Sequence, residues 1–189
     1  AFSLTARREG EYGTPAGYDN GRPKAITGTT VDLIASDVSD LYIQRINPIA
    51  VYNDATAPVL LAPEDTEVAG VGVIQGQKTL LQGTSALNRL DVRKLMIFIR
   101  RSVRKEAEKV LFEPNQPATL ATLSRAVTGI LDGLVAAGAV EQFRVVIDDT
   151  TTSQADIENN TVRGKVFVKP FRSVEIISID INIENAGAF

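Results

Sequence analysis

Two stretches in the middle of the chain carry the residue spacing of amphipathic helices. In residues 89–111 and 117–138, apolar side chains recur every three or four positions, which places them on one side of a helix. Pro117 suits the first turn of the second helix, and Gly138 suits its C-terminal end. We expect both apolar stripes to lie in the core. They consist of Val92, Leu95, Met96, Ile99, Val103, Ala107 and Val110, and of Leu120, Leu123, Val127, Ile130, Leu131 and Leu134.

Toward the C-terminus, apolar and polar residues alternate, which predicts β-strands. The alternation covers residues 143–147, 166–168 and 177–183. Together with the two helices it predicts the α+β class, with a mixed β-sheet and two long helices packed on one face. We expect both apolar helix stripes to pack against these C-terminal strands.

The N-terminal part is punctuated by glycine and proline and lacks a sustained period. We expect residues 1–30 to be an extended arm or linker, and residues 31–189 to be one α+β domain with a further extended arm at its C-terminus. Ser36 is expected to cap a short helix that runs through Asp40 and Ile43. This helix ends before Asn47-Pro48, because a residue ahead of proline avoids helical backbone. Short β-rich runs follow at 49–52, 59–61 and 71–74.

Composition narrows the possible functions. The 189 residues include no histidine and no cysteine, which closes the usual serine, cysteine and zinc mechanisms. A formal net charge of −3 is too small to indicate a nucleic-acid partner for the chain as a whole. No apolar run reaches the ~18 residues of a membrane-spanning helix, so we expect no membrane insertion. Carboxylate pairs, lysine chemistry and oxygen-ligated metals stay open, but we expect no enzyme and no cofactor.

Two segments resemble ligand sites only superficially. Residues 72–79 end in Lys78-Thr79, as a phosphate-binding loop does, but that loop needs glycine where Gln77 stands. The densest acidic group could ligate Mg²⁺ or Ca²⁺ through oxygen, yet its spacing matches no EF-hand and suits a polar turn. This group consists of Asp148, Asp149, Asp156 and Glu158. We expect a solvated loop and no metal site there.

The polar side of the helix predicted at 89–111 is strongly basic. Glu106 and Glu108 are its only acidic residues, so few partners balance the cations. Ile97 projects into this basic side, and an apolar residue ringed by arginines is typical of an interface. The basic face consists of Arg93, Lys94, Arg100, Arg101, Arg104 and Lys105, around Ile97. An acidic protein partner is favoured over a solvated surface, and also over nucleic acid, because no aromatic platform or base-reading motif accompanies the charges.

The alternation near the C-terminus is the most regular in the chain. Its apolar positions are Ile177, Ile179, Ile181 and Ile183. A long β-branched strand at an edge is an aggregation hazard unless another strand covers it. It either forms a hairpin with the strand near 162–169 or adds to the sheet of a neighbouring copy, and both arrangements can hold together.

The order of short motifs along the chain resembles the tail sheath proteins of contractile-tailed bacteriophages. The similarity runs from about residue 14 to residue 183. The motifs are Pro15-Ala16-Gly17 with Gly21, Asp40-Leu41-Tyr42, Asn47-Pro48-Ile49, Gly76-Gln77-Lys78-Thr79-Leu80, Asn88-Arg89-Leu90-Asp91-Val92-Arg93-Lys94-Leu95, Leu111-Phe112-Glu113-Pro114-Asn115, Phe143-Arg144-Val145-Val146-Ile147-Asp148, and Gly164-Lys165-Val166 with Pro170. The family's N-terminal portion and most of its outer region have no counterpart here, so the resemblance implies the C-terminal part of a longer sheath protein.

The resemblance implies a structural role in the virion. Sheath subunits of this family stack as hexameric rings around a rigid tube, and contraction of the helical sheath drives the tube through a host envelope. Terminal arms add strands to the sheets of neighbouring subunits. The implied partners are further copies of the chain, the tail tube protein, and baseplate and tail terminator proteins, with no direct nucleic-acid contact. Assembly is implied to occur in the host bacterial cytoplasm.

Three other functions stay open at this point. The first is a sheath of a tailocin or a related contractile injection system. The second is a metal enzyme built on Asp148, Asp149 and Asp156, which metal-dependent thermal stabilisation would support. The third is a nucleic-acid-binding module that uses the basic face, for which a steep salt dependence of affinity would be the marker.

Overall fold

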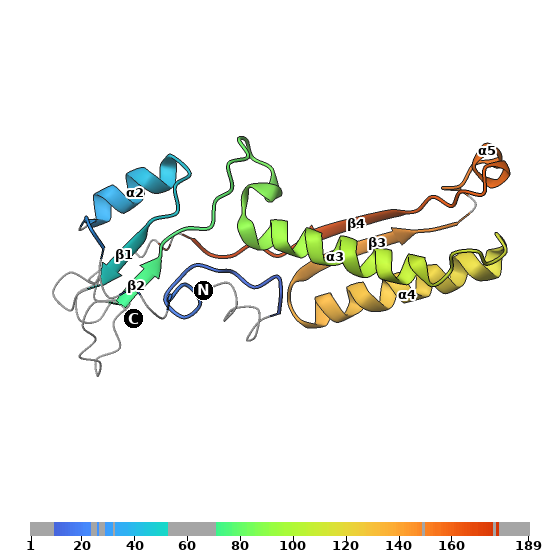
Figure 1. The fold of residues 1–189 in the computed structure, drawn as a ribbon, viewed down its shortest axis with the longest axis horizontal. Coiled ribbons are helices and arrows are strands. Elements are labelled where there is room, and N and C mark those ends of the chain that lie inside the picture. Colours follow the sequence, from blue (N-terminus) through green and yellow to red (C-terminus); the bar gives the residue numbers. More distant parts are fainter. Residues whose placement is uncertain are drawn as a thin grey trace, which may run out of the picture.

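The structure is a computed structural model that describes residues 10–23, 26, 29–31, 33–52, 71–148, 150–175 and 177. Its elements, in chain order, are α2 (Ala35–Ile43), β1 (Ile49–Tyr52), β2 (Val71–Ile74), the 3-10 helix η1 (Ala86–Asn88), α3 (Leu90–Glu108), α4 (Pro117–Ala136), β3 (Val140–Val146), α5 (Gln154–Glu158) and β4 (Lys165–Pro170). The arrangement is elongated, with α2, β1 and β2 at one end and α3, α4, β3 and β4 in the other half (Figure 1). The short helix α5 lies at the far tip.

The two long helices form an antiparallel pair where the apolar stripes predicted them. Pro117 occupies the first turn of α4, where its missing N–H costs no hydrogen bond. Gly138 follows the last turn with φ +70°, a left-handed conformation that glycine adopts without strain. Its N–H bonds Val135 O and the Ala139 N–H bonds Leu134 O, which ends the helix in a Schellman motif. Both predicted helix signals at this element are confirmed.

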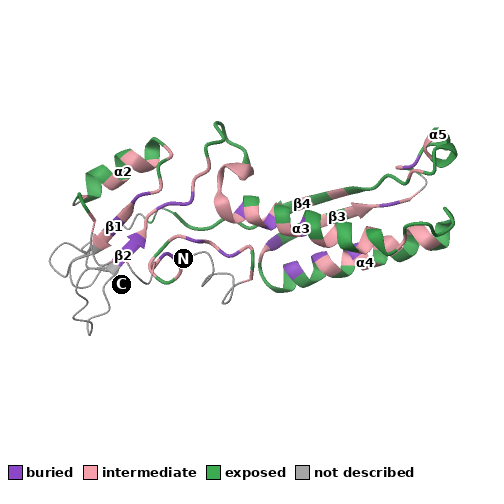
Figure 2. Ribbon diagram, viewed as in Figure 1, coloured by how far each residue is buried: buried purple, intermediate pink, exposed green. Residues whose placement is uncertain are grey.

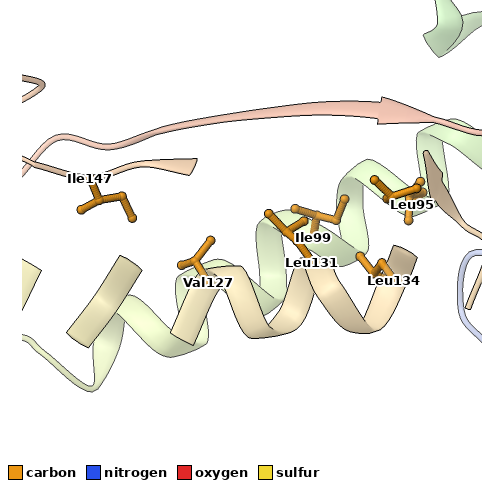
Figure 3. Packing of buried hydrophobic residues seen from close by; sticks show 7 residues of the cluster. Leu95, Ile99, Val127, Leu131, Leu134 and Ile147 are labelled. Atoms are coloured by element: carbon orange, nitrogen blue, oxygen red, sulfur yellow. The ribbon is translucent and has the colours of Figure 1, made fainter. Parts of the chain in front are cut away.

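The hydrophobic core joins one side of each long helix to β3. It is built from Leu95, Ile99, Val127, Leu131, Leu134, Val140 and Ile147, with Val127, Leu131 and Val140 fully buried (Figure 3). Val103 and Leu123 are partly buried and pack against this cluster. Ile130 is half-buried and Leu131 is the central residue, so the stripe of α4 is rotated slightly from the predicted centre. The predicted core faces are confirmed.

The strands correct one part of the sequence prediction. The α+β class is confirmed, but the described strands form two separate antiparallel pairs, β1 with β2 and β3 with β4, in place of one mixed sheet. Ile49 lies opposite Ile74, and Val145 lies opposite Val166. The reason is connectivity: the α3–α4 pair lies between β2 and β3 in the sequence and carries β3 into the other half of the molecule. The run predicted at 59–61 lies outside the described residues.

The N-terminal segment 10–23 lies against both halves. The Gly17 N–H donates to Ile74 O at 3.0 Å, and the Ile74 N–H donates to Gly21 O at 2.9 Å, so this segment lies alongside the end of β2. Tyr12 meets Phe98 of α3 edge-on, with ring centroids 5.5 Å apart. Residues 1–9, the remainder of the segment expected as an arm, lie outside the described residues. The division into arm and domain stays a prediction.

Helix α4 also has the length and composition of a helix that could cross a membrane. Its mean hydropathy over 18 residues is 1.2, because Arg125 and Asp132 are its only charged residues. The sequence predicts no membrane span, because no uninterrupted apolar run reaches the required length. The buried side of α4 packs against α3 and β3, a pattern shared by core helices of globular domains. The absence of membrane insertion therefore stays a prediction.

Candidate assembly surfaces

The basic face of α3 lies on the side of the helix opposite the core. Its members Arg93, Arg100, Arg101, Arg104 and Lys105 are all exposed, and Ile97 among them is 49% exposed. The helix turns every 3.6 residues, so burial of Val92, Leu95 and Ile99 forces these side chains outward. The structure therefore brings these five basic residues together on one exposed face, as seen in the alternating burial along α3 (Figure 2). Lys94, also predicted for this face, is only partly exposed, and its ammonium donates to Gly13 O at 2.7 Å.

Few acidic side chains neutralise this face. Arg101 pairs with Glu11 at 3.2 Å and Arg104 with Glu108 at 3.0 Å, and all four side chains are more than half exposed. Exposed pairs of this kind contribute little, about 0–1 kcal/mol. Across the described part of the chain, Arg93, Arg100 and Lys105 have no ion-pair partner. The face keeps cationic groups that an acidic surface can bind.

The segment after β4 continues toward the half that contains α2, β1 and β2 (Figure 1). Val174 and Ile177 are 80% and 76% exposed. The remaining predicted strand residues, Ile179, Ile181 and Ile183, lie outside the described residues. Their role in contacts between copies stays a prediction. Ile177, the first residue of that strand, presents its side chain to solvent.

Glu175 anchors this C-terminal segment to three other parts of the chain. Its carboxylate lies 2.5 Å from Arg89 Nε, accepts a hydrogen bond from Gln77 Nε2 at 3.3 Å, and accepts another from the Tyr42 hydroxyl. Glu175 counts as exposed when its backbone is included, but only 18% of its side-chain surface is exposed. The carboxylate is therefore enclosed by the end of α2, the loop after β2 and the start of α3.

The electrostatics of this anchor follow from its partners. Burial raises the pKa of Glu175, but the hydrogen bonds from Tyr42 and Arg89 outweigh burial and hold that pKa below its usual value. Burial, together with the hydrogen bond to Glu175, raises the pKa of Tyr42 to about 12. At neutral pH the anchor therefore combines an ionised carboxylate with a protonated phenol.

Further polar contacts hold the residues around the anchor. The Thr14 hydroxyl donates to Gln77 Oε1 at 2.8 Å, and the Asn47 side chain exchanges two 2.8 Å bonds with the backbone of Lys78. Lys78 Nζ lies 3.6 Å from the centre of the Tyr42 ring. Burial, and then the nearby charge of Arg89, lower the pKa of Lys78. The segment that resembled a phosphate loop is thus a structural junction in which Gln77 is buried.

This anchor was not predicted from the sequence. Its members Tyr42, Gln77, Arg89 and Glu175 are far apart in the chain and share no periodic pattern. One signal in the sequence is Gln77, a polar residue that closely follows a predicted strand. It stands where a phosphate-binding loop would have glycine. A buried amide needs hydrogen-bond partners, and those partners came from distant segments.

The acidic residues near 148–158 act as turn and cap residues. Asp156 accepts hydrogen bonds from the Ser153 backbone and hydroxyl and pairs with Arg163 at 2.7 Å. The Ser153 hydrogen bonds, with Arg163, lower the pKa of Asp156 to about 2. Asp148 accepts from the Thr150 amide, and Asp149 lies outside the described residues. No group of three potential metal ligands forms among the residues that the structure describes.

The fold is an α+β domain with an exposed basic face and an exposed C-terminal segment. Residues 82–184, more than half of the chain, match the family described as "Phage tail sheath C-terminal domain". The chain belongs to this family. The predictions of a contractile tail sheath family and of a structural, non-enzymatic domain are confirmed.

Two curated relatives extend this match. The chain is similar to the tail sheath protein of Vibrio phage KVP40, with 29% identity over 168 residues, covering 88% of this chain and 23% of the relative. It is also similar to the tail sheath protein of Enterobacteria phage T4, with 25% identity over 176 residues, covering 93% of this chain and 24% of the relative. The chain thus spans about a quarter of the length of these relatives.

Solved structures share the fold. A chain of the anti-feeding prophage baseplate superposes with a TM-score of 0.80 at 19% identity, covering 97% of this chain and 48% of that one. A chain of the contracted sheath complex of PVC, an extracellular contractile injection system, gives 0.76 at 19% identity, covering 97% and 49%. At this level of identity the likeness establishes the fold.

Proposed function

We propose that this chain is the polymerising part of a contractile tail sheath subunit, which assembles helically around a tail tube and contracts to drive the tube through the host envelope. The observation that carries the proposal is the family match over residues 82–184, because that range includes the helix pair, the β3–β4 pair and the residues of the predicted terminal strand. The proposed setting is the tail of a phage virion that is assembled in the host cytoplasm. Baseplate and tail terminator proteins are its further partners at the ends of the sheath.

Strand addition links the copies in this proposal. The β3–β4 pair has only two strands, so among the described residues the outer edge of each strand lacks a ladder partner. An arm from a neighbouring copy supplies both hydrogen bonds and apolar side chains to such an edge. Ile177, Ile179, Ile181 and Ile183 are the proposed strand. Main-chain hydrogen bonds tolerate small rotations at the ends of an arm, which suits subunits that move relative to one another.

The basic face of α3 is the proposed contact with the tube. Its exposed cations and the half-exposed Ile97 fit an acidic protein surface that has an apolar spot. Reversing the charge at both Arg101 and Arg104 is expected to weaken co-assembly with tube while the domain stays folded. Sheathing of tubes at wild-type levels by this variant at moderate salt would place the contact elsewhere.

The alternative function is the sheath of a tailocin or a related contractile injection system. It is favoured by the likeness in fold to the anti-feeding prophage and PVC structures. Particles purified from the producing cell separate the two functions: a capsid with packaged DNA on the sheathed tail indicates a phage, and isolated tails indicate the alternative.

Electron microscopy of the full-length protein tests the proposed class itself. The expected result is tubes or stacked rings. A dispersed monomer that forms neither, alone or with tube, would contradict the proposal.

A further inference from the structure

The turn between α3 and α4 presents a phenylalanine that no contact among the described residues explains. Phe112 is fully exposed, at 103%, and its neighbour Leu111 is 60% exposed. Phe112 also has φ +69°, the left-handed region that bulky residues rarely adopt. The Glu113 N–H bonds Val110 O, which any residue at position 112 would allow. Glycine would adopt the same backbone conformation without strain. The phenylalanine ring therefore makes no contact with the described residues that offsets its strain.

A cavity lies at the opposite end of the same helix pair. Its volume is about 540 Å³, within the range of roughly 300–1,000 Å³ for pockets that enclose ligands. Tyr12, Val92, Leu95, Ala139 and Phe171 supply apolar walls, and Arg172 lies at its polar side. The cavity is therefore suited to an aromatic side chain that carries an acidic neighbour.

The charges beside the ring and beside the cavity are complementary. Glu113 follows Phe112 directly, and Arg172 lines the cavity. Both are exposed, and neither has an ion-pair partner within the described ranges. Asp91, the acidic residue of the lining, accepts a hydrogen bond from the Ser173 hydroxyl at 2.6 Å.

The two features cannot meet within one molecule. The turn and the cavity lie at opposite ends of α3, whose 19 residues span about 28 Å at 1.5 Å per residue. A contact between them must therefore join two copies head to tail. Such an interface leaves each copy with one free ring and one free cavity, so it propagates into a ring or a helix.

We propose that Phe112 of one copy inserts into the cavity beside Phe171 of the next copy, with Glu113 pairing with Arg172 across the contact. This contact rests on the proposed self-assembly and is separate from strand addition by the arms. Burial of an aromatic anchor in a pocket, with a charge pair at its rim, is the usual composition of an interface hot spot.

The test compares variants of the full-length protein by the concentration at which they polymerise, measured by sedimentation and electron microscopy. Phe112→Gly removes the ring and relieves the backbone strain, so it is expected to stay folded and to raise that concentration by about tenfold or more. Ala137→Phe, at the exposed cavity wall, is expected to have a similar effect by filling the cavity. Leu80→Ala is the matched control, an exposed apolar residue away from both features, and should polymerise within about twofold of wild type.

A charge exchange identifies the partner as a second copy. Glu113→Arg and Arg172→Glu should each impair assembly, and the double variant should recover most of it. Wild-type assembly by Phe112→Gly, or a double variant worse than both single ones, would overturn the contact while leaving the sheath function intact. A wild-type protein that never polymerises would instead defeat the proposed function.

Discussion

The two halves of the molecule are stabilised by different kinds of interaction. In the half that contains α3, α4, β3 and β4, contiguous apolar side chains pack around Leu131, which is fully buried. In the other half, α2 has no buried residue, Ala50 of β1 and Val73 of β2 are buried, and a polar junction around Glu175, Gln77 and Asn47 connects the segments. A packed apolar core makes its elements one rigid body. Hydrogen bonds and an ion pair instead set the direction in which the C-terminal segment leaves the junction. The first half is therefore suited to be the rigid body, and the second sets where the C-terminal arm departs.

The largest expected effect comes from emptying the core of the first half. Leu131→Ala should lower the free energy of unfolding by about 2–5 kcal/mol, because it leaves a cavity among closely packed side chains. Ile99→Ala should fall in the same range, and Ile130→Ala below it, since Ile130 is half-buried. Urea denaturation followed by circular dichroism measures these differences. Ile97→Ala on the exposed side is the control, and a loss there as large as that of Leu131→Ala would contradict the assignment of the helix faces.

A smaller and more local effect is expected at the Glu175 anchor. Glu175→Gln keeps the shape but removes the charge that Arg89 pairs with, so it should cost about 1–3 kcal/mol. Tyr42→Phe removes one hydrogen bond and should cost less, about 1 kcal/mol. Hydrogen exchange should show faster opening near residues 77 and 175 while α3 and α4 keep their protection. Equal loss of protection across the α3–α4 pair would mean that the two halves do not differ as described.

The pH dependence of stability sharpens the same comparison. The folded pKa of Glu175 lies below the ordinary 4.5, so its contribution is fully present above pH 4.5 and is lost as the pH falls through the lowered pKa. The folded pKa of Tyr42 is raised from 10.0 to about 12, so its contribution is fully present below pH 10.0 and is lost as the pH rises through about 12. The free energy of unfolding, measured by denaturation at a series of pH values, should depend less on pH below 4.5 for Glu175→Gln than for wild type. Above pH 10.0 the difference should be smaller, because burial, the largest cause of the raised Tyr42 pKa, remains in the variant. Identical curves would contradict the anchor.

The smallest effect is expected at the tip of the first half. Ser153 caps α5 by accepting the Asp156 N–H, so Ser153→Ala should destabilise this short helix by about 1 kcal/mol. Because α5 adds no residue to the buried core, the global free energy of unfolding should hardly change. Amide exchange within residues 154–158 measures the local loss, with Ser102→Ala on α3 as a control for serine removal.

What the sequence could predict follows the same division. Periodicity predicted α3, α4, β3 and β4 and most of their core. Each of these elements buries one side, so its apolar residues recur every 3.6 residues in a helix or every two in a strand. Short β-rich runs between turn residues predicted β1 and β2 with the bounds seen in the structure. The sequence did not predict that the strands pair as two separate sheets, since pairing depends on where the connecting helices carry the chain. The anchor at Glu175 was missed because its contacts join residues up to 133 positions apart and have no period.

The basic face and the terminal strand illustrate two further limits. Exposure of Arg93, Arg100 and Arg104 follows from helix geometry once the apolar stripe is known, so the face could be predicted, but its partner could not. The strand at Ile177–Ile183 was predicted from alternation alone, and only its first residue lies among the described ones. Alternation predicts a strand and leaves open which sheet it joins.

Removing the C-terminal segment tests the central claim most directly. Full-length protein lacking residues 174–189 loses both the anchor and the strand, and a second variant lacking 178–189 keeps Glu175 and Ile177 but loses the strand. A third, lacking only 184–189, should weaken the connection between copies more than folding. Electron microscopy of the three beside wild type should show no sheaths for the first two variants, while their circular dichroism stays that of a folded protein. Contractile sheaths of normal length assembled without residues 174–189 would contradict the account.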